Sequence, residues 1–128
     1  MSALSPRSPE VAHFRGQRAE DCVADRLEAD GWRIRARNWR AAGGELDLVA
    51  ERAGVLRFVE VKARDDDPAG ALLSVSHDKQ RRLRNAGNAW LAAHGEPACE
   101  VAFLVALVDL RDDRPPEAWA VDWWDDAF

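Results

Sequence analysis

Lysine and cysteine are scarce in this chain of 128 residues. Only Lys62 and Lys79 are lysines among its 18 basic residues, and the remainder are arginines. The two cysteines, Cys22 and Cys99, have no CxxC or Cys–His spacing, which excludes a disulfide framework and predicts buried, reduced thiols. The longest apolar run, Val101–Val108, is far shorter than the ~20 residues of a membrane span. With no signal segment at the N-terminus, we expect a cytoplasmic protein with no membrane partner.

The length predicts one domain over residues 9–128, preceded by a flexible lead over residues 1–8. The formal net charge of -5 argues at first against a nucleic-acid binder, because phosphate contacts need basic side chains. The charge is unevenly placed, however, since residues 1–108 hold 16 acids and 16 bases. The whole acidic excess therefore lies in a tryptophan-rich C-terminal segment, residues 109–128.

Hydrophobic periodicity predicts elements in the order α-β-β-β-α-β-β. The expected helices run from Pro9 to about Gly31 and from Ser76 to His94, and the expected strands are Trp32–Arg37, Glu45–Glu51, Val55–Arg64, Glu100–Leu110 and Trp119–Trp123. A meander followed by a helical crossover to a buried strand predicts an α/β fold, a mixed β-sheet flanked by helices.

Strict alternation makes two further predictions about the faces of the first strands. The first strand would carry Arg33, Arg35 and Arg37 on one face. The second would carry Leu46, Leu48 and Ala50 on one face.

A short hairpin sets the register of two carboxylates. If Ala53 and Gly54 alone form the loop, Arg52 pairs with Val55 and Asp47 lies opposite Glu60. The two Cβ atoms would then be roughly 5 Å apart, whereas a three-residue loop would shift the register by one. Alternation also places Glu60 and Lys62 on one face of their strand.

Opposed carboxylates are destabilising in a purely structural sheet, and a hard divalent cation removes the conflict. Mg2+ bound by Asp47 and Glu60 could activate a water molecule and polarise a phosphoryl oxygen, while Lys62 orients the nucleophile or stabilises developing charge. The alternative is a surface ion pair between Glu60 and Lys62, because ExK alone is a frequent pattern.

Two more charged residues are candidates for the same cluster. Glu20 lies in the apolar stripe of the first helix, between Gly16 and Ala24, where an unpaired acid is rarely found. Lys79 lies in the first turn of the second helix, where a cation opposes the helix dipole. Both lysines thus fall beside the acids, where arginine does not easily replace a compact charge with a tunable pKa. Glu20 can also be a rim residue.

Two groups of basic residues are candidates for phosphate binding. Arg37, Asn38 and Arg40 belong to one, and Arg81 and Arg82 to the other. The alternative is that both are solvated faces.

The tryptophans are expected to have different roles. Trp39 is the best candidate for stacking on a base, whereas Trp32, Trp90 and Trp119 are expected in the core. The pair Trp123-Trp124 would cover a sheet edge or meet a partner. Gly43-Gly44 precedes a strand and not a helix, which excludes a P-loop.

As a set, these motifs resemble the YraN-type family of predicted bacterial nucleases, in the PD-(D/E)xK superfamily, which is similar to Holliday-junction resolvases. The segments that carry the resemblance are Gly16-Gln-Arg-Ala-Glu20, Arg37-Asn-Trp-Arg40, Gly44-Glu-Leu-Asp-Leu48, Phe58-Val-Glu-Val-Lys-Ala-Arg64 and Val75 to Lys79. The resemblance implies a restriction-endonuclease-like fold, with Mg2+ held by Asp47 and Glu60, Lys62 as the catalytic lysine and Glu20 as an additional acid. Lys79 matches a family lysine of less defined role. The loop Asp65–Leu73 departs from the family by being unusually acidic.

We therefore hypothesise a metal-dependent endonuclease that hydrolyses branched or otherwise structured DNA. Asp47, Glu60, Glu20 and the carbonyl of Val61 would bind Mg2+, with Mn2+ as an alternative ion. By analogy with symmetric junctions, a homodimer is attractive. The competing hypothesis is a non-catalytic module that keeps the fold, binds nucleic acid or a protein, and uses the acidic C-terminal segment as its contact.

Overall fold

The structure is a computed structural model that describes residues 9–63, 76–94 and 100–125, with side chains of the first helix described from Phe14 onward. The predicted flexible lead, the acidic loop Asp65–Leu73 and Cys99 lie outside the described residues. Cys22 is a buried free thiol, as predicted, and burial raises its pKa. Neither helix in this part of the chain is long and apolar enough to cross a membrane.

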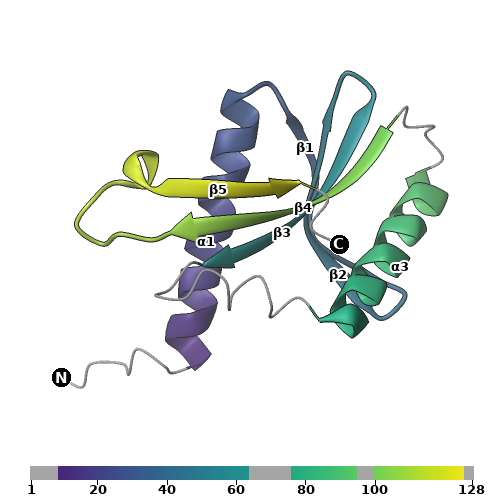
Figure 1. Cartoon of the computed structure of the whole chain (residues 1–128), viewed down its shortest axis with the longest axis horizontal. Coiled ribbons are helices and arrows are strands. Elements are labelled where there is room, and N and C mark those ends of the chain that lie inside the picture. The colour runs from purple at the N-terminus through teal and green to yellow at the C-terminus, as the bar shows by residue number, and fades with distance from the viewer. Residues whose placement is uncertain (1–8, 64–75, 95–99, 126–128) are drawn as a thin grey trace.

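One five-stranded sheet with strand order β1-β2-β3-β4-β5 organises the molecule (Figure 1). The elements in chain order are α1 (Pro9–Ala29), β1 (Arg33–Ala41), β2 (Gly44–Arg52), β3 (Val55–Ala63), α3 (His77–His94), β4 (Glu100–Asp109), a 3-10 turn (Pro116–Ala118) and β5 (Ala120–Asp125). β3 and β4 are parallel, and the other neighbours are antiparallel. The predicted mixed sheet and element order are confirmed, in agreement with a restriction-endonuclease-like fold.

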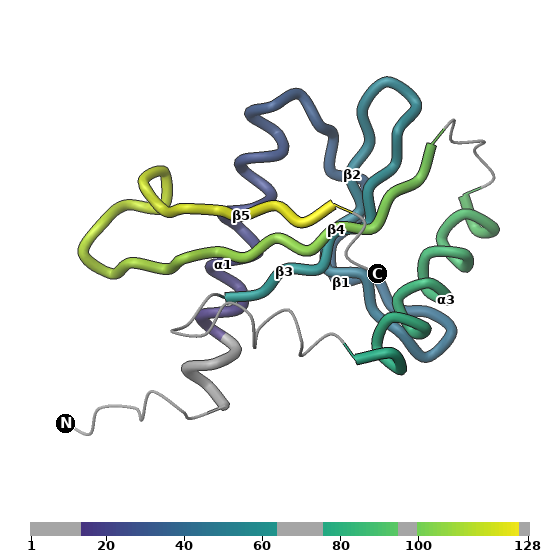
Figure 2. Tube along the Cα trace, viewed as in Figure 1, coloured from purple at the N-terminus to yellow at the C-terminus, as the bar shows by residue number. Residues whose placement is uncertain are grey.

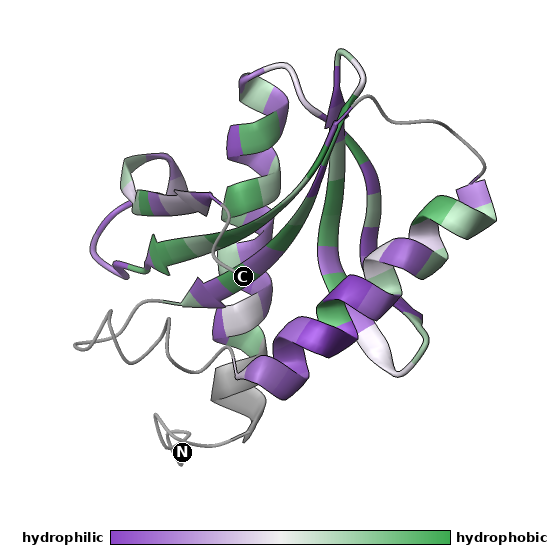
Figure 3. Ribbon diagram, turned by 45° about the vertical axis from the view of Figure 1, so that its right-hand side comes forward, coloured by the Kyte–Doolittle hydropathy of each residue, from purple (hydrophilic) through white to green (hydrophobic). Residues whose placement is uncertain are grey.

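The two helices cover opposite faces of the sheet, as the turned view in Figure 3 shows. α1 buries Ala19, Val23 and Leu27 against one face, in a core that also contains Trp32 and Trp119. α3 buries a second core against the other face, with Leu83 and Trp90 as its large side chains. Alternate residues of β3 and β4 enter the two cores, which is why these central strands are apolar on both sides.

Two short hairpin turns and a helix cap form as the sequence indicates. The tube in Figure 2 shows that the β1–β2 and β2–β3 turns lie at opposite ends of the sheet. Ala53 and Gly54 both have positive φ, at 49° and 81°, as a two-residue turn of type I′ requires. At the start of α3, the amide of Lys79 donates to Oγ of Ser76 at 3.2 Å, the predicted N-cap.

The prediction that Arg33, Arg35 and Arg37 share a face is wrong because a β-bulge lies between Ile34 and Ala36. The extra residue reverses the alternation. Arg35 consequently lies over Trp90 of α3 and pairs with Glu51. Arg37 reaches α1 on the opposite face. The basic strip expected along this strand is therefore divided between the two faces.

The prediction for the second strand is also wrong in one residue. Leu48 and Ala50 enter the core beneath α1, but Leu46 enters the core beneath α3. The change of face falls at Asp47, where the strand departs from regular pairing. This local irregularity sets the direction in which the side chain of Asp47, the candidate acid, leaves the strand.

The C-terminal segment is attached to α1 through its backbone. The guanidinium of Arg26 donates to the carbonyls of Pro116, Glu117 and Trp119. Trp119 is buried, as predicted, and its indole donates to the carbonyl of Arg111 at 2.8 Å. β5 then forms an edge of the sheet, with Trp123 and Trp124 39% and 45% exposed. The described part of the acidic segment thus contributes a strand and a core residue.

Candidate active site

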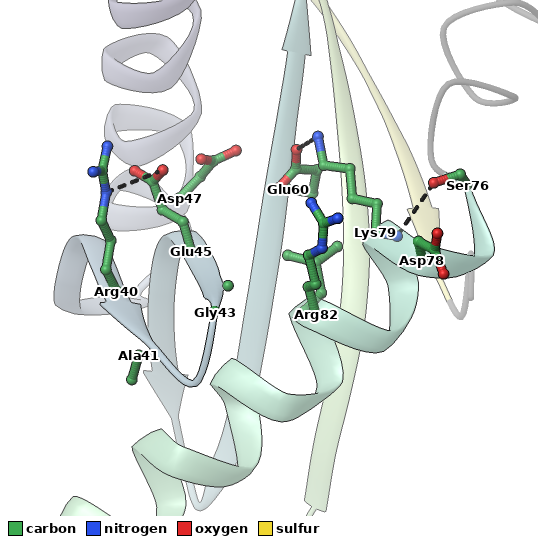
Figure 4. A pocket seen from close by; sticks show the side chains of 12 residues that line it. Arg40, Ala41, Gly43, Glu45, Asp47, Glu60, Ser76, Asp78, Lys79 and Arg82 are labelled. Atoms are coloured by element: carbon green, nitrogen blue, oxygen red, sulfur yellow. Dashed lines mark hydrogen bonds and ion pairs between the residues drawn. The ribbon is translucent and has the colours of Figure 1, made fainter.

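The candidate site is a cleft where the β1–β2 turn, the end of β3 and the first turns of α3 meet (Figure 4). Its volume is about 840 Å³. The residues that line it are Arg40, Ala41, Gly43, Gly44, Glu45, Asp47, Glu60, Ser76, Asp78, Lys79, Arg82 and Leu83. A second cleft of about 400 Å³ shares Asp47, Arg40 and Glu45 with it. It is completed by Asn38, Val61 and three residues of α1, Gly16, Gln17 and Glu20. Asp47 thus lies where two clefts meet.

The predicted hairpin register is confirmed from Arg52–Val55 as far as Leu48–Val59. The described pairing of β2 with β3 stops there, one residue before Asp47 and Glu60. Oδ2 of Asp47 instead accepts a hydrogen bond from the amide of Val61 at 2.8 Å. The carboxylate therefore occupies a place that a strand carbonyl would take in a continuous ladder.

The surroundings of Asp47 disfavour its charged form. Burial and the adjacent charge of Glu60 raise the pKa of Asp47 to about 8, although the hydrogen bond from Val61 acts in the opposite direction. A hydrogen bond with Glu60 and the charge of Glu20 raise it further. Asp47 therefore retains its proton near neutral pH unless a cation takes its place.

Two lysines approach Glu60 from different elements. Nζ of Lys79, on α3, lies 2.7 Å from Oε1 of Glu60, and Nζ of Lys62, on β3, lies 3.7 Å from the same oxygen. Glu60 is 6% exposed and is largely shielded from water. The two ammonium groups are its charge partners. The structure therefore brings together four of the residues that the sequence predicted for the site.

The pKa values of the two lysines are shifted in opposite directions. Burial lowers the pKa of Lys62, and the adjacent Lys79 lowers it further against the pull of Glu60 and Asp47. Burial lowers the pKa of Lys79. Hydrogen bonds to Glu60 and Lys62, together with the charges of Glu60 and Asp47, outweigh burial and raise this pKa overall. Lys62 is consequently the more readily deprotonated of the pair.

Glu20 faces the second cleft but is held by β1. Its Oε1 accepts hydrogen bonds from Nε and Nη2 of Arg37, at 3.3 and 3.2 Å, and from Nδ2 of Asn38 at 3.0 Å. Arg37 also pairs with Asp21, whose hydrogen bond is the main cause of its raised pKa. Two residues predicted to bind nucleic acid therefore position the acid of α1 here.

Asn38 adopts an unusual backbone conformation, with φ of 51°. Asparagine tolerates this left-handed region better than most residues. The register on either side places Asn38 opposite Asp47, and this pair is missing from the described β1–β2 ladder. Asp47 thus lies at an irregular place in the pairing with both of its neighbouring strands.

Comparison with known proteins places the chain among bacterial relatives. Residues 19–109 match the uncharacterised protein family UPF0102. The chain belongs to UPF0102. A UPF0102 protein of Synechococcus sp. (strain JA-3-3Ab) is 46% identical over 120 residues, covering 88% of this chain and 89% of the relative. UPF0102 protein gll3754 of Gloeobacter violaceus is 53% identical over 94 residues, covering 70% and 74%. UPF0102 protein RPA0323 of Rhodopseudomonas palustris is 47% identical over 102 residues, covering 77% and 76%.

The matched UPF0102 region contains the predicted site residues from Glu20 to Arg82. The resemblance stated from the motifs is therefore confirmed at the level of the family. The family match names no activity, so chemistry has to be argued from the geometry.

The donors around Asp47 suit a hard divalent cation. Asp47 and Glu60 provide carboxylate oxygens, and burial beside each other makes a positive ion between them favourable. Val61 lines the cleft beside Asp47, and its amide donates a hydrogen bond to Asp47. In an extended strand the carbonyl of a residue points to the same edge as its amide, so the Val61 carbonyl faces the same side of β3. As the side chains are placed, no three acids, histidines or cysteines among the described residues form a metal-holding group. Glu20 therefore stays a prediction as a ligand.

Two of the arginines predicted to contact nucleic acid line the cleft, and a third is exposed on α3. Arg40 and Arg82 line it from β1 and α3, and the side chain of Arg40 is 79% exposed beside Glu45 at 3.4 Å. Arg81 is also exposed and pairs with Asp78 at 2.6 Å. Their guanidinium groups have solvent access, as phosphate binding requires.

Trp39 is partly buried, which disfavours the base stacking predicted for it. It packs edge-on against Trp90, with ring centroids 5.5 Å apart, and lies against the core beneath α3. The basic composition around Trp39 suggested an exposed aromatic, but its ring lies against α3, on the opposite face of β1 from Arg37, because the alternation of the strand is broken at Asn38.

Sequence reasoning missed the structural role of Gly44. A Cβ at this position would lie 2.3 Å from the carbonyl oxygen of Arg82, so only glycine lets the β1–β2 turn approach the α3 backbone. The same turn carries Glu45, which lines both clefts and was not predicted as a site residue. The available signal was the position of both residues within the motif Gly44-Glu-Leu-Asp-Leu48.

Proposed function

We propose that this protein is a Mg2+-dependent endonuclease that hydrolyses phosphodiester bonds in DNA, with branched or otherwise structured DNA as the substrate class. The observation that supports it best is the buried acid pair, Asp47 and Glu60, with two lysines beside it. Such an arrangement is costly for stability alone, and its parts are those that phosphoryl hydrolysis needs.

Each residue has a separate task in this proposal. Asp47, Glu60 and the Val61 carbonyl would hold the ion, which supplies Lewis acidity and a more acidic bound water. Lys62 has a lowered pKa, which suits it to orient the attacking water and exchange a proton with it. Lys79 remains charged, neutralises Glu60 and can stabilise negative charge on the phosphate.

The exposed arginines supply the contact with DNA. Arg40 and Arg82 lie on two sides of the cleft, and Arg81 extends the basic surface along α3. Contacts to phosphate position a nucleic acid without reading its sequence. The proposal therefore includes a salt-dependent affinity that is largely independent of base sequence.

A non-catalytic module is the second candidate. Trp123 and Trp124 are partly exposed on the edge strand β5, a surface that suits a protein partner. In this alternative the acid pair holds an ion or proton for structural reasons only.

Cleavage of a panel of DNA substrates tests the two functions. The full chain is incubated with junction, flap, single-stranded and linear DNA in Mg2+, in Mn2+ and in EDTA. We expect metal-dependent cleavage, strongest on a branched substrate, that is lost in Asp47→Asn and retained in Arg114→Gln, a change at an exposed residue. Cleavage that persists in Asp47→Asn would contradict the proposed site. Binding without cleavage in every condition would favour the module.

A further inference from the structure

β5 is the last strand of the sheet and leaves one edge of it open in the part of the chain that the structure describes (Figure 1). It pairs with β4 over all six of its residues, Ala120–Asp125, without a break in register. The backbone groups on its other edge therefore form a regular row of donors and acceptors, with which a second extended chain can pair. None of the six residues lines either cleft of the candidate active site.

The edge strand at the other side of the sheet, β1, is less suited to such pairing. A β-bulge lies between Ile34 and Ala36, and a bulge is one of the devices that protect a free edge from other chains. Within β5 no proline, lysine or bulge serves this purpose. Its acids, Asp122 and Asp125, repel another acidic strand but attract a basic one, so they restrict the choice of partner without closing the edge.

Each face of β5 carries one tryptophan and one aspartate, two positions apart. Val121 packs against the core beneath α1, so alternation places Trp123 and Asp125 on that face. Asp122 and Trp124 consequently lie on the face of α3. Two positions along a strand are about 7 Å apart, a gap that one guanidinium or ammonium group can occupy. An aromatic ring beside a carboxylate binds such a cation through cation–π attraction and a charged hydrogen bond.

The charge around β5 favours a basic partner. Residues 109–125 hold six acids and only two bases, Arg111 and Arg114. DNA phosphates and the β5 strand of a second copy would both bring negative charge to this edge and are repelled. A basic, extended segment of another protein is attracted, and its backbone can continue the ladder as an added strand.

We propose that the free edge of β5 binds an extended segment of another protein that contains two adjacent basic residues, arginine or lysine. Adjacent residues of a strand point to opposite faces. One basic side chain therefore meets Trp123 and Asp125, and the next meets Asp122 and Trp124. This partner chemistry suits the surface that the second candidate function uses, but it requires neither that function nor DNA cleavage.

Two blocked peptides of identical composition test the proposal. Thr-Val-Arg-Arg-Val-Thr places its arginines on both faces of an added strand, whereas Thr-Arg-Val-Arg-Val-Thr places both on one face. Each peptide is titrated into the isotope-labelled full chain, and nuclear magnetic resonance follows the backbone amides and the tryptophan indoles. We expect saturable shifts at Ala120–Asp125 and not at the exposed face of α3. The affinity for the peptide with adjacent arginines should be at least about threefold higher, because only this peptide engages both faces.

Variants separate this contact from general charge attraction. Trp123→Ser is expected to remove the preference between the two peptides, since one cation site is then lost. Phe14→Ser, which changes an exposed aromatic on α1, is the matched control and should retain the preference. The double change Asp122→Asn and Asp125→Asn should weaken binding several-fold and reduce its salt dependence, which provides a second test if Trp123→Ser does not fold.

Three results would overturn the proposal. The first is the absence of saturable shifts at β5 with either peptide. The second is equal affinity for the two peptides, or a preference that persists in Trp123→Ser. The third is a dimer of the free chain, detected by sedimentation, in which the amides of β5 are protected from hydrogen exchange, because a second copy would then occupy the edge.

Discussion

The protein places its acidic side chains in two contrasting settings. Asp47 and Glu60 are withdrawn from water, adjacent to each other and beside two lysines. Asp112, Asp113 and Asp125, in the C-terminal segment, are exposed. The second group accounts for much of the net charge, yet the first group has the perturbed chemistry. Net charge thus says little about function here, because burial and neighbours determine what an acid can do.

The largest expected effect concerns the lysine beside the buried acids. Lys62→Met removes the amine whose lowered pKa suits it to proton exchange with water. We expect Mg2+-dependent DNA cleavage to slow by at least about 100-fold, since general acid–base catalysis typically contributes this much or more. Initial rates on the best substrate of the panel measure it. Removing the exposed charge in Arg114→Gln should leave the rate unchanged, and equal losses in both variants would contradict a specific role for Lys62.

The pH dependence of stability should separate the two groups of acids. The pKa of Asp47 is about 8 in the folded chain against 3.8 for an ordinary aspartate. Between these values the folded state keeps a proton that the unfolded state loses, so Asp47 makes stability fall as pH rises. We expect a decrease on the order of a few kcal/mol in EDTA, measured by urea unfolding from pH 4 to pH 8.

Asp47→Asn provides the control because it cannot ionise. Its unfolding free energy should lack this contribution. If the unfolding free energy changed with pH equally in the wild type and the variant, Asp47 would have an ordinary pKa.

The contact that brings α3 over the acids should also matter for stability. In Gly44→Ala the new Cβ meets the Arg82 backbone, so the turn or the helix must shift. We expect a loss of about 1–3 kcal/mol in the free energy of unfolding, as for other overpacked sites. Gly16→Ala is the matched control, because nothing lies within 4 Å of its added Cβ on α1. There the same change should be neutral or stabilise the helix by up to about 1 kcal/mol. Equal effects in the two variants would refute the close approach.

An exposed acid should have the smallest effect. Asp112 pairs with Arg18 at 2.9 Å, but its side chain is 80% exposed. Asp112→Asn should change the unfolding free energy by less than about 0.5 kcal/mol, because exposed ion pairs contribute little. Thermal or urea unfolding of this variant provides the baseline, and a change above about 2 kcal/mol would remove the contrast between the two groups of acids.

Much of the fold was predictable because the strongest signals are local. Positive φ values at Ala53 and Gly54 allow the short turn that the sequence predicted, and this turn fixes the register that brings Asp47 near Glu60. The element order followed from periodicity, and the family followed from the motifs.

The rest depends on packing between distant elements. The bulge near Arg35 cannot be read from an alternating pattern, and it divided the arginines between two faces. The hydrogen bonds that Arg37 and Asn38 donate to Glu20 depend on how α1 crosses β1. Mg2+, DNA, a homodimer and a cytoplasmic location stay predictions.

Binding of Mn2+ or Mg2+ to the DNA-free protein is the most direct test of the central claim, that Asp47 and Glu60 are buried together to hold a divalent cation. Calorimetric titration at several pH values measures both the affinity and the protons released. We predict saturable binding that strengthens from pH 6 to pH 8, as the ion displaces the proton of Asp47, and that weakens at least about tenfold in Asp47→Asn. Equal affinities in the wild type and Asp47→Asn, or no dependence on pH, would contradict the account.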